Sequence, residues 1–139
     1  MLRNTTEIRV RYSETDQMGR VYYANFLVYF EVARTQLIRK YWKPYSELEK
    51  EGYLLPVLKA SCQYHHPVGY DDLIHIETYL TMPRPTILHF DYIVKALEYS
   101  VLVAEGSTEH CFIDTAGKPK RVPQELVQLI KEHPGEPSK

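Results

Sequence analysis

The chain has 139 residues, of which 44% belong to the set AVILMFWYC and 25% are charged, as in an ordinary soluble domain. Seventeen basic and eighteen acidic residues give a formal charge of -1, so the chain lacks the positive field that attracts nucleic acid or anionic lipid. These values favour one compact domain and argue against DNA or RNA binding.

Several further features of the sequence indicate a cytoplasmic protein. Residues 1–6 lack the apolar core of a signal peptide, and the best apolar run, residues 26–30, is far shorter than a membrane span. Cys62 and Cys111 have no CxxC partner, which favours two small buried thiols over a disulfide or a metal site. The proline-rich residues 133–139 have the composition of a disordered tail, so we expect one domain that ends at residue 132.

The first forty residues predict a short strand, a polar loop and the main helix. Alternation of apolar and charged residues predicts a strand over residues 7–12, and the loop follows at residues 13–20. Apolar residues at helical spacing predict a helix over residues 22–40, in which Glu31 and Arg34 can pair one turn apart. The first half of this helix is apolar on nearly every face, so we expect other parts of the protein to surround it.

A short helix is predicted next, over residues 44–52, with Ser46 as its cap and Gly52 as its stop. After Gly52 the apolar period changes from 3.6 to 2, which predicts strands over residues 55–66, 73–82, 86–97 and 101–113. The breaks between them are short, so we expect neighbouring strands to be antiparallel. A final short amphipathic helix begins with Pro123. The simplest arrangement is an α+β domain in which an antiparallel sheet wraps around the long helix.

Residues 11–26 are the most informative segment, because they place an acidic loop directly before a helix N-terminus. That end of a helix carries free N–H groups and a positive partial charge, and Glu14 or Asp16 can cap it. The same arrangement resembles half of a hydrolytic site, in which the amides polarise a carbonyl and the carboxylate attacks it or activates water. From the residues alone both interpretations stay open.

The segment also resembles a known family. The matching positions are Arg11, Thr15-Asp16, Gly19, Val21-Tyr22, Asn25-Phe26, Glu31 and Ala33-Arg34. They closely resemble the signature of the hotdog-fold acyl-CoA thioesterases of the 4-hydroxybenzoyl-CoA thioesterase type. Residues 64–72 resemble the "strand, Pro, small turn, Asp" junction of that family and residues 114–123 its closing turn, so the resemblance covers nearly the whole chain.

The resemblance implies a hotdog fold and hydrolysis of an acyl-CoA thioester without a metal or another cofactor. It assigns the catalytic carboxylate to Asp16 and an oxyanion-polarising backbone N–H to Tyr23. Some members of the bacterial branch tied to the Tol-Pal envelope system have histidine where this chain has Tyr23, but a backbone amide survives that change.

Candidate substrate-binding residues lie in the same segment and in one turn. The segment contributes Met18, Gly19, Tyr22, Asn25 and Phe26. Among these, Met18, Tyr22 and Phe26 suit an uncharged acyl group. Arg84, between two strands, can meet a phosphate of CoA or be a solvated turn residue, and the same two readings apply to Lys118, Lys120 and Arg121.

Other chemistries have little support. His65 and His66 are adjacent on a predicted strand and point to opposite faces, while His75, His89 and His110 lack metal-ligand spacing. No Gly-x-Ser-x-Gly, Walker A or Gly-x-Gly-x-x-Gly motif occurs. The alternatives that remain are a thioesterase acting on acyl carrier protein and a non-catalytic acyl-CoA-binding domain.

We also expect an obligate homo-oligomer of at least two chains, and the sequence favours a tetramer over a dimer. One sheet on one helix leaves an edge strand and an outer face exposed, and we place Tyr64, Tyr79 and Tyr92 on that face.

Overall fold

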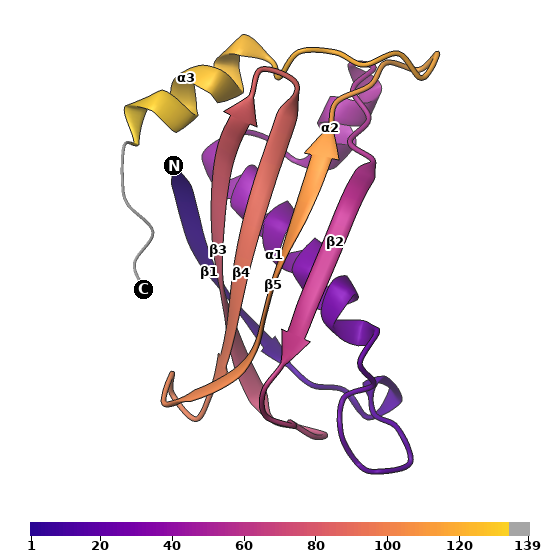
Figure 1. Ribbon diagram of the computed structural model, residues 1–139, viewed down its shortest axis with the longest axis vertical. Coiled ribbons are helices and arrows are strands. Elements are labelled where there is room, and N and C mark those ends of the chain that lie inside the picture. The colour runs from indigo at the N-terminus through magenta and orange to yellow at the C-terminus, as the bar shows by residue number, and fades with distance from the viewer. Residues whose placement is uncertain (134–139) are drawn as a thin grey trace.

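The computed structural model describes residues 1–133 and contains five strands and four helices. The strands are β1 (Leu2–Arg9), β2 (Val57–Tyr64), β3 (Leu73–Arg84), β4 (Ile87–Ala96) and β5 (Val101–Cys111). The helices are the single 3₁₀ turn η1 (Tyr12–Glu14), the long α1 (Asn25–Tyr41), the short α2 (Tyr45–Lys50) and α3 (Gln124–Glu132). Figure 1 shows α1 lying along one face of the sheet, which is the predicted α+β architecture.

The sheet is antiparallel throughout, in the order β1-β3-β4-β5-β2. The expectation that neighbouring strands are antiparallel is confirmed. Strands β2 and β3 do not pair with each other, because residues 65–72 carry the chain across the sheet, and β2 pairs with β5 while β3 pairs with β1. The first strand begins at Leu2, five residues before the predicted start, because its polar N-terminal half pairs with β3 as far as Leu80.

The core forms between α1 and the sheet. Five side chains at helical spacing are buried there, from Phe26, Tyr29, Phe30, Ala33 and Leu37. The ring of Phe30 stacks on Tyr92 of β4, with centroids 4.2 Å apart and planes 5° from parallel. Gly106 of β5 makes room for this stack, because a Cβ atom there would lie 2.7 Å from Cε2 of Phe30.

The expectation of a surrounded helix is wrong for the single chain. Leu27, Val28 and Val32 on the outer side of α1 keep 41%, 51% and 37% of their surface exposed. The sheet covers only one side of α1 (Figure 1), so the apolar residues on the other side face solvent in an isolated chain.

Two of the three tyrosines expected on the outer face are buried. Tyr92 is 1% exposed and faces α1, and Tyr79 is 4% exposed, whereas Tyr64 keeps 49% of its surface exposed. Both cysteines are free. Cys111 is buried as expected, whereas Cys62 is only half-buried.

The helix ends agree with the sequence in part. Gly52, with φ +88°, follows α2 as predicted, but Ser46 is not the cap, because α2 begins after Pro44 without a side-chain cap. The salt bridge expected between Glu31 and Arg34 does not form within the described residues. Helix α3 follows Pro123 as predicted.

The disordered tail predicted for residues 133–139 falls, from residue 134 on, outside the described residues. Within residues 1–133, every helix is too short or too polar to cross a membrane.

Candidate active site

The acidic loop closes on itself between Thr15 and Val21, which form an isolated antiparallel bridge. The N–H of Asp16 donates to the carbonyl of Arg20 at 2.8 Å, and the N–H of Gly19 donates back to the carbonyl of Asp16 at 3.0 Å. Gly19 has φ +76°, a conformation that glycine adopts without steric cost. This tight turn fixes the position of Asp16.

The carboxylate of Asp16 has one engaged and one open oxygen. Oδ1 accepts hydrogen bonds from the N–H groups of Met18 at 2.9 Å and Arg20 at 3.4 Å. Oδ2 has no hydrogen-bond partner among residues 1–133. Asp16 therefore caps its own loop. The interpretation of Asp16 as the cap of α1 is wrong, since α1 begins at Asn25, after the N-cap residue Ala24, without a side-chain cap.

A second turn, residues 64–72, packs against the acidic loop and hydrogen bonds to it. The N–H of Val21 donates to the carbonyl of Val68 at 2.8 Å. Gly69 lies so close to the loop that a Cβ atom on it would be 2.8 Å from the carbonyl oxygen of Gly19. The turn itself is closed by Asp72, whose Oδ2 accepts from the N–H of Gly69 at 2.8 Å.

Glu14 joins the loop to the helix. Its Oε1 accepts from the N–H of Arg11 at 2.8 Å and from the hydroxyl of Tyr29 at 2.9 Å. Its carbonyl accepts from the N–H of Tyr22 and from the side-chain amide of Asn25, both at 2.9 Å. Burial alone would raise the pKa of Glu14, but the bonds from Arg11 and Tyr29 outweigh it and lower that pKa below its ordinary value.

The start of α1 leaves two backbone donors open. The N–H groups of Asn25, Phe26 and Leu27 donate to the carbonyls of the residues three positions earlier. Those of Tyr23 and Ala24 have no acceptor within the described part of the chain. Unpaired donors at a helix start carry positive partial charge, so this turn can polarise a carbonyl oxygen.

A cavity of about 290 Å³ brings the expected catalytic residues together. It is lined by Asp16, Met18, Arg20, Val21, Tyr23, Phe26, Tyr64, His65, His66, Pro67 and Val68. Among the residues chosen from the sequence, four meet here: Asp16 and Tyr23 for catalysis, Met18 and Phe26 for binding. The sequence did not identify the wall residues at 64–68, although this segment resembles the junction turn of the family.

The other predicted binding residues lie outside this lining. Gly19 shapes the loop, Asn25 donates its amide to Glu14, and the ring of Tyr22 packs 4.8 Å from that of Tyr23. Arg84 lies at the end of β3 beside the β3–β4 turn, across the molecule from the acidic loop (Figure 1), so its contact with CoA stays a prediction.

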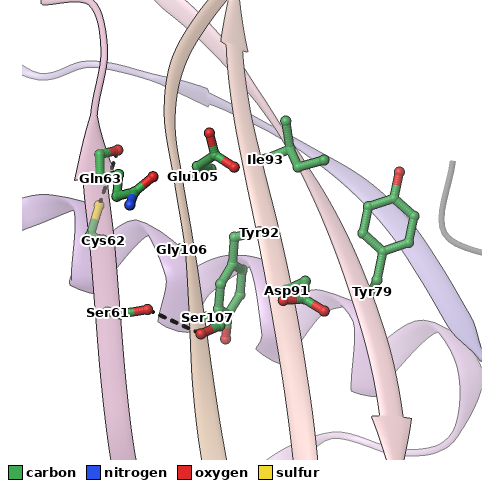
Figure 2. Close-up of a pocket in the computed structure, with 10 residues that line it drawn as sticks. All are labelled: Ser61, Cys62, Gln63, Tyr79, Asp91, Tyr92, Ile93, Glu105, Gly106 and Ser107. Carbon is green, nitrogen blue, oxygen red and sulfur yellow. Dashed lines mark hydrogen bonds between the residues drawn. The ribbon is translucent and has the colours of Figure 1, made fainter. Parts of the chain in front are cut away.

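A larger cavity of about 580 Å³ lies against the face of the sheet that is turned away from α1 (Figure 2). Its two carboxylates are already paired: Glu105 contacts His65 at 2.8 Å, and Asp91 contacts His89 at 3.1 Å. Ser61 and Ser107 bond to each other at 3.1 Å across β2 and β5 (Figure 2). Every residue that lines this cavity lies in a strand, so no helix start with unpaired N–H groups faces its carboxylates, and the smaller cavity is the better candidate.

Within residues 1–133, no three His, Cys, Asp or Glu side chains lie close enough together to hold a metal ion. His65 and His66 follow the end of β2, and the backbone N–H groups of both donate to the carbonyl of Val103.

The arrangement at the smaller cavity can support hydrolysis of an activated carbonyl. An open carboxylate oxygen can attack or activate water, and an open backbone N–H can stabilise the oxyanion that develops. The apolar side chains of Met18 and Phe26 suit an uncharged group beside that carbonyl.

Comparisons with known proteins agree with this chemistry. Over 125 residues, 90% of this chain and 93% of the relative, the sequence is 30% identical to the acyl-CoA thioester hydrolase YbgC of Escherichia coli. Over 74 residues, about half of each chain, it is 47% identical to YneP of Bacillus subtilis. The structure resembles a DHNA-CoA thioesterase from Staphylococcus aureus with a TM-score of 0.88 and 29% identity, over 95% of this chain and 91% of that one.

These likenesses confirm the expected fold and the expected class of enzyme, a thioester hydrolase. Residues 10–130, nearly the whole described chain, match the thioesterase-like superfamily, and the chain belongs to that family.

Proposed function

We propose that this protein is an acyl-CoA thioesterase that hydrolyses its substrate to a free acid and CoA at the cavity beside Asp16. The observation that carries the proposal is the meeting, in one cavity, of a carboxylate with an open Oδ2 and a residue, Tyr23, whose backbone N–H has no acceptor among residues 1–133. The relatives named as acyl-CoA thioesterases support the same substrate class.

The proposed chemistry starts from the thioester carbonyl. As general base, Asp16 takes a proton from water, and the hydroxide adds to the carbonyl carbon to give a tetrahedral oxyanion. As nucleophile, Asp16 adds to that carbon itself, and water hydrolyses the resulting anhydride. In both routes the Tyr23 N–H stabilises the oxyanion, and the C–S bond breaks with release of CoA as its thiolate. That thiolate takes up a proton to leave as the free thiol.

The proposed acyl group is apolar, either aliphatic or aromatic. The cavity places Met18, Val21 and Phe26 around the reactive carboxylate, and an acyl group with its own carboxylate would meet Asp16 at close range. The CoA part is proposed to lie on the surface, and the enzyme to work in the cytoplasm.

The test is release of free thiol from short, long, aromatic and dicarboxylic acyl-CoAs. We expect hydrolysis of at least one neutral acyl-CoA with a higher kcat/KM than that of succinyl- or malonyl-CoA. A preference for either dicarboxylic substrate overturns the proposed acyl class. No thiol release from any acyl-CoA, together with tight binding of one of them, identifies a binding domain instead. Activity on acylated carrier protein alone identifies the other alternative.

We also propose a homo-oligomer, at least a dimer. Seven of the eight residues of the edge strand β2 are exposed, and its outer edge has no backbone partner within residues 1–133. Helix α1 contacts β2 and carries the exposed apolar residues Leu27, Val28 and Val32. A second copy can cover the open strand edge and these apolar residues.

Sedimentation tests this assembly. We expect a species of at least two chains at micromolar concentration, and dissociation when Leu27→Lys places a charge on α1. Leu97→Lys is the control, because Leu97 is 71% exposed in the β4–β5 turn. A monomeric wild-type protein contradicts the proposal.

A further inference from the structure

Tyr64 reaches from the end of β2 to the start of α1 across 41 residues of sequence. Its hydroxyl donates to the carbonyl of Tyr23 at 3.1 Å. Its ring makes edge contacts with Phe26, at a centroid distance of 5.5 Å, and with Tyr23, at 6.3 Å. These contacts place Tyr64 in the wall of the Asp16 cavity, directly against the residue with the open N–H.

Hydrogen bonds hold the two peptides that flank the one carrying this N–H. On one side, the N–H of Tyr22 donates to the carbonyl of Glu14 at 2.9 Å. On the other side, the carbonyl of Tyr23 accepts from Tyr64 at 3.1 Å and from the N–H of Phe26 at 3.3 Å. The bond from Tyr64 is the only side-chain hydrogen bond to the backbone of Tyr23 within residues 1–133, and it ties the turn to the sheet.

We propose that Tyr64 is a positioning residue, which holds the Tyr23 N–H where it meets the oxyanion by hydrogen bonding to the Tyr23 carbonyl. This inference rests on the proposed thioesterase function. A preorganised donor stabilises the transition state without having to move during the reaction, and small misplacements of such groups cost much of the rate.

The hydroxyl of Tyr64 stays protonated over the working pH range. Burial, followed by a hydrogen bond with Cys62, raises the pKa of Tyr64 to about 12. Tyr64 is therefore a constant donor to Tyr23 at neutral pH, and its effect on catalysis does not titrate there.

The test compares Tyr64→Phe with Tyr70→Phe. Phenylalanine keeps the ring contacts with Phe26 and Tyr23 and removes only the hydroxyl. Tyr70 is the matched control, since it lies in the neighbouring turn, is 61% exposed, and its hydroxyl has no hydrogen-bond partner among residues 1–133. We expect Tyr64→Phe to lower kcat about 10- to 100-fold with KM nearly unchanged. We also expect faster amide exchange at Tyr23 and Ala24, and no effect of Tyr70→Phe.

The outcomes separate this inference from the proposed function. Active wild-type protein with an equally active Tyr64→Phe variant overturns the positioning role alone. A change confined to KM, or a loss of kcat that only follows a lowered unfolding temperature, also overturns it. Wild-type protein that releases no thiol from any acyl-CoA overturns the proposed function and this inference together.

Discussion

Glu14 and Asp16 are two residues apart in one loop and play different parts. The carboxylate of Glu14 accepts hydrogen bonds from Arg11 and Tyr29, whereas Asp16, which lines the cavity, has one oxygen without a hydrogen-bond partner among residues 1–133. The family-like motif in the sequence predicts the catalytic role of Asp16. For Glu14 the sequence predicts only a possible helix cap, because the contact with Tyr29 depends on how the loop folds back on α1.

Replacement of Glu14 by glutamine should destabilise the fold at neutral pH. The amide keeps the size but loses the charge that strengthens the bonds from Arg11 and Tyr29, and we expect a loss of about 1–2 kcal/mol in the free energy of unfolding. Urea unfolding measures it, with the exposed Glu98→Gln as control.

The effect of Glu14→Gln should depend on pH. The pKa of Glu14 is lowered in the folded protein from its ordinary 4.5, so its contribution is complete above pH 4.5 and disappears as pH falls through the folded value. The difference between wild type and variant should therefore shrink as pH falls below 4.5. A difference that grows toward acid pH contradicts the role assigned to Glu14.

At the scale of elements, apolar period predicted every strand and the long helix to within a few residues at most boundaries. It did not predict the order of the strands in the sheet. The apolar period identifies which residues of a strand face the core, but it does not identify which other strand pairs with it. The crossing of residues 65–72 places β2 at the sheet edge and sets its last residue, Tyr64, beside the start of α1. The family-like turn was visible in the sequence, but its packing against Gly19 was not.

The contact between α1 and β5 depends on a glycine. A Cβ atom at Gly106 would lie 2.3 Å from the carbonyl oxygen of Ser61 and 2.7 Å from the ring of Phe30. The Ser61 backbone and the stacked ring of Phe30 cannot both move away without loss of packing and hydrogen bonds. Gly106→Ala should therefore lower the free energy of unfolding by about 1–3 kcal/mol. Leu102→Ala, at a position of the same strand that is 40% exposed, is the control. Equal stabilities of the two variants would show that β5 relaxes around the added methyl group.

At the scale of the whole molecule, a buried polar chain runs through the sheet. The hydroxyl of Thr108 bonds to Tyr92 at 2.7 Å and to Nε2 of His110 at 2.8 Å. Burial, and next the nearby charge of Arg34, lower the pKa of His110 to about 4, so the folded protein holds this imidazole neutral.

This buried histidine predicts a loss of stability in mild acid. Between pH 6.5 and about 4 the unfolded chain binds a proton at His110 that the folded protein does not, so stability falls as pH falls through this window. The loss amounts to about 3 kcal/mol. His110→Gln should flatten the dependence of the free energy of unfolding on pH, and the exposed His133→Gln should leave it unchanged. Equal slopes in both variants would assign the acid loss to other groups.

The outer side of α1 shows what a single sequence predicts at this scale. Its apolar residues Leu27, Val28 and Val32 led to the expectation of a surrounded helix, but the sheet of the same chain leaves them exposed. The sequence pattern shows that this side of α1 is apolar, but it does not show whether the same chain or a second copy covers it. Sedimentation tests whether a second copy does.

The replacement Asp16→Asn tests the central claim most directly. Asparagine keeps an oxygen that can accept from the N–H of Met18, so the loop, the fold and the assembly should survive. It can neither attack a thioester nor take a proton from water, so kcat on the best acyl-CoA should fall by roughly 100- to 10,000-fold with an unchanged unfolding temperature. Turnover close to that of the wild type would leave Asp16 as a loop residue only and contradict the account.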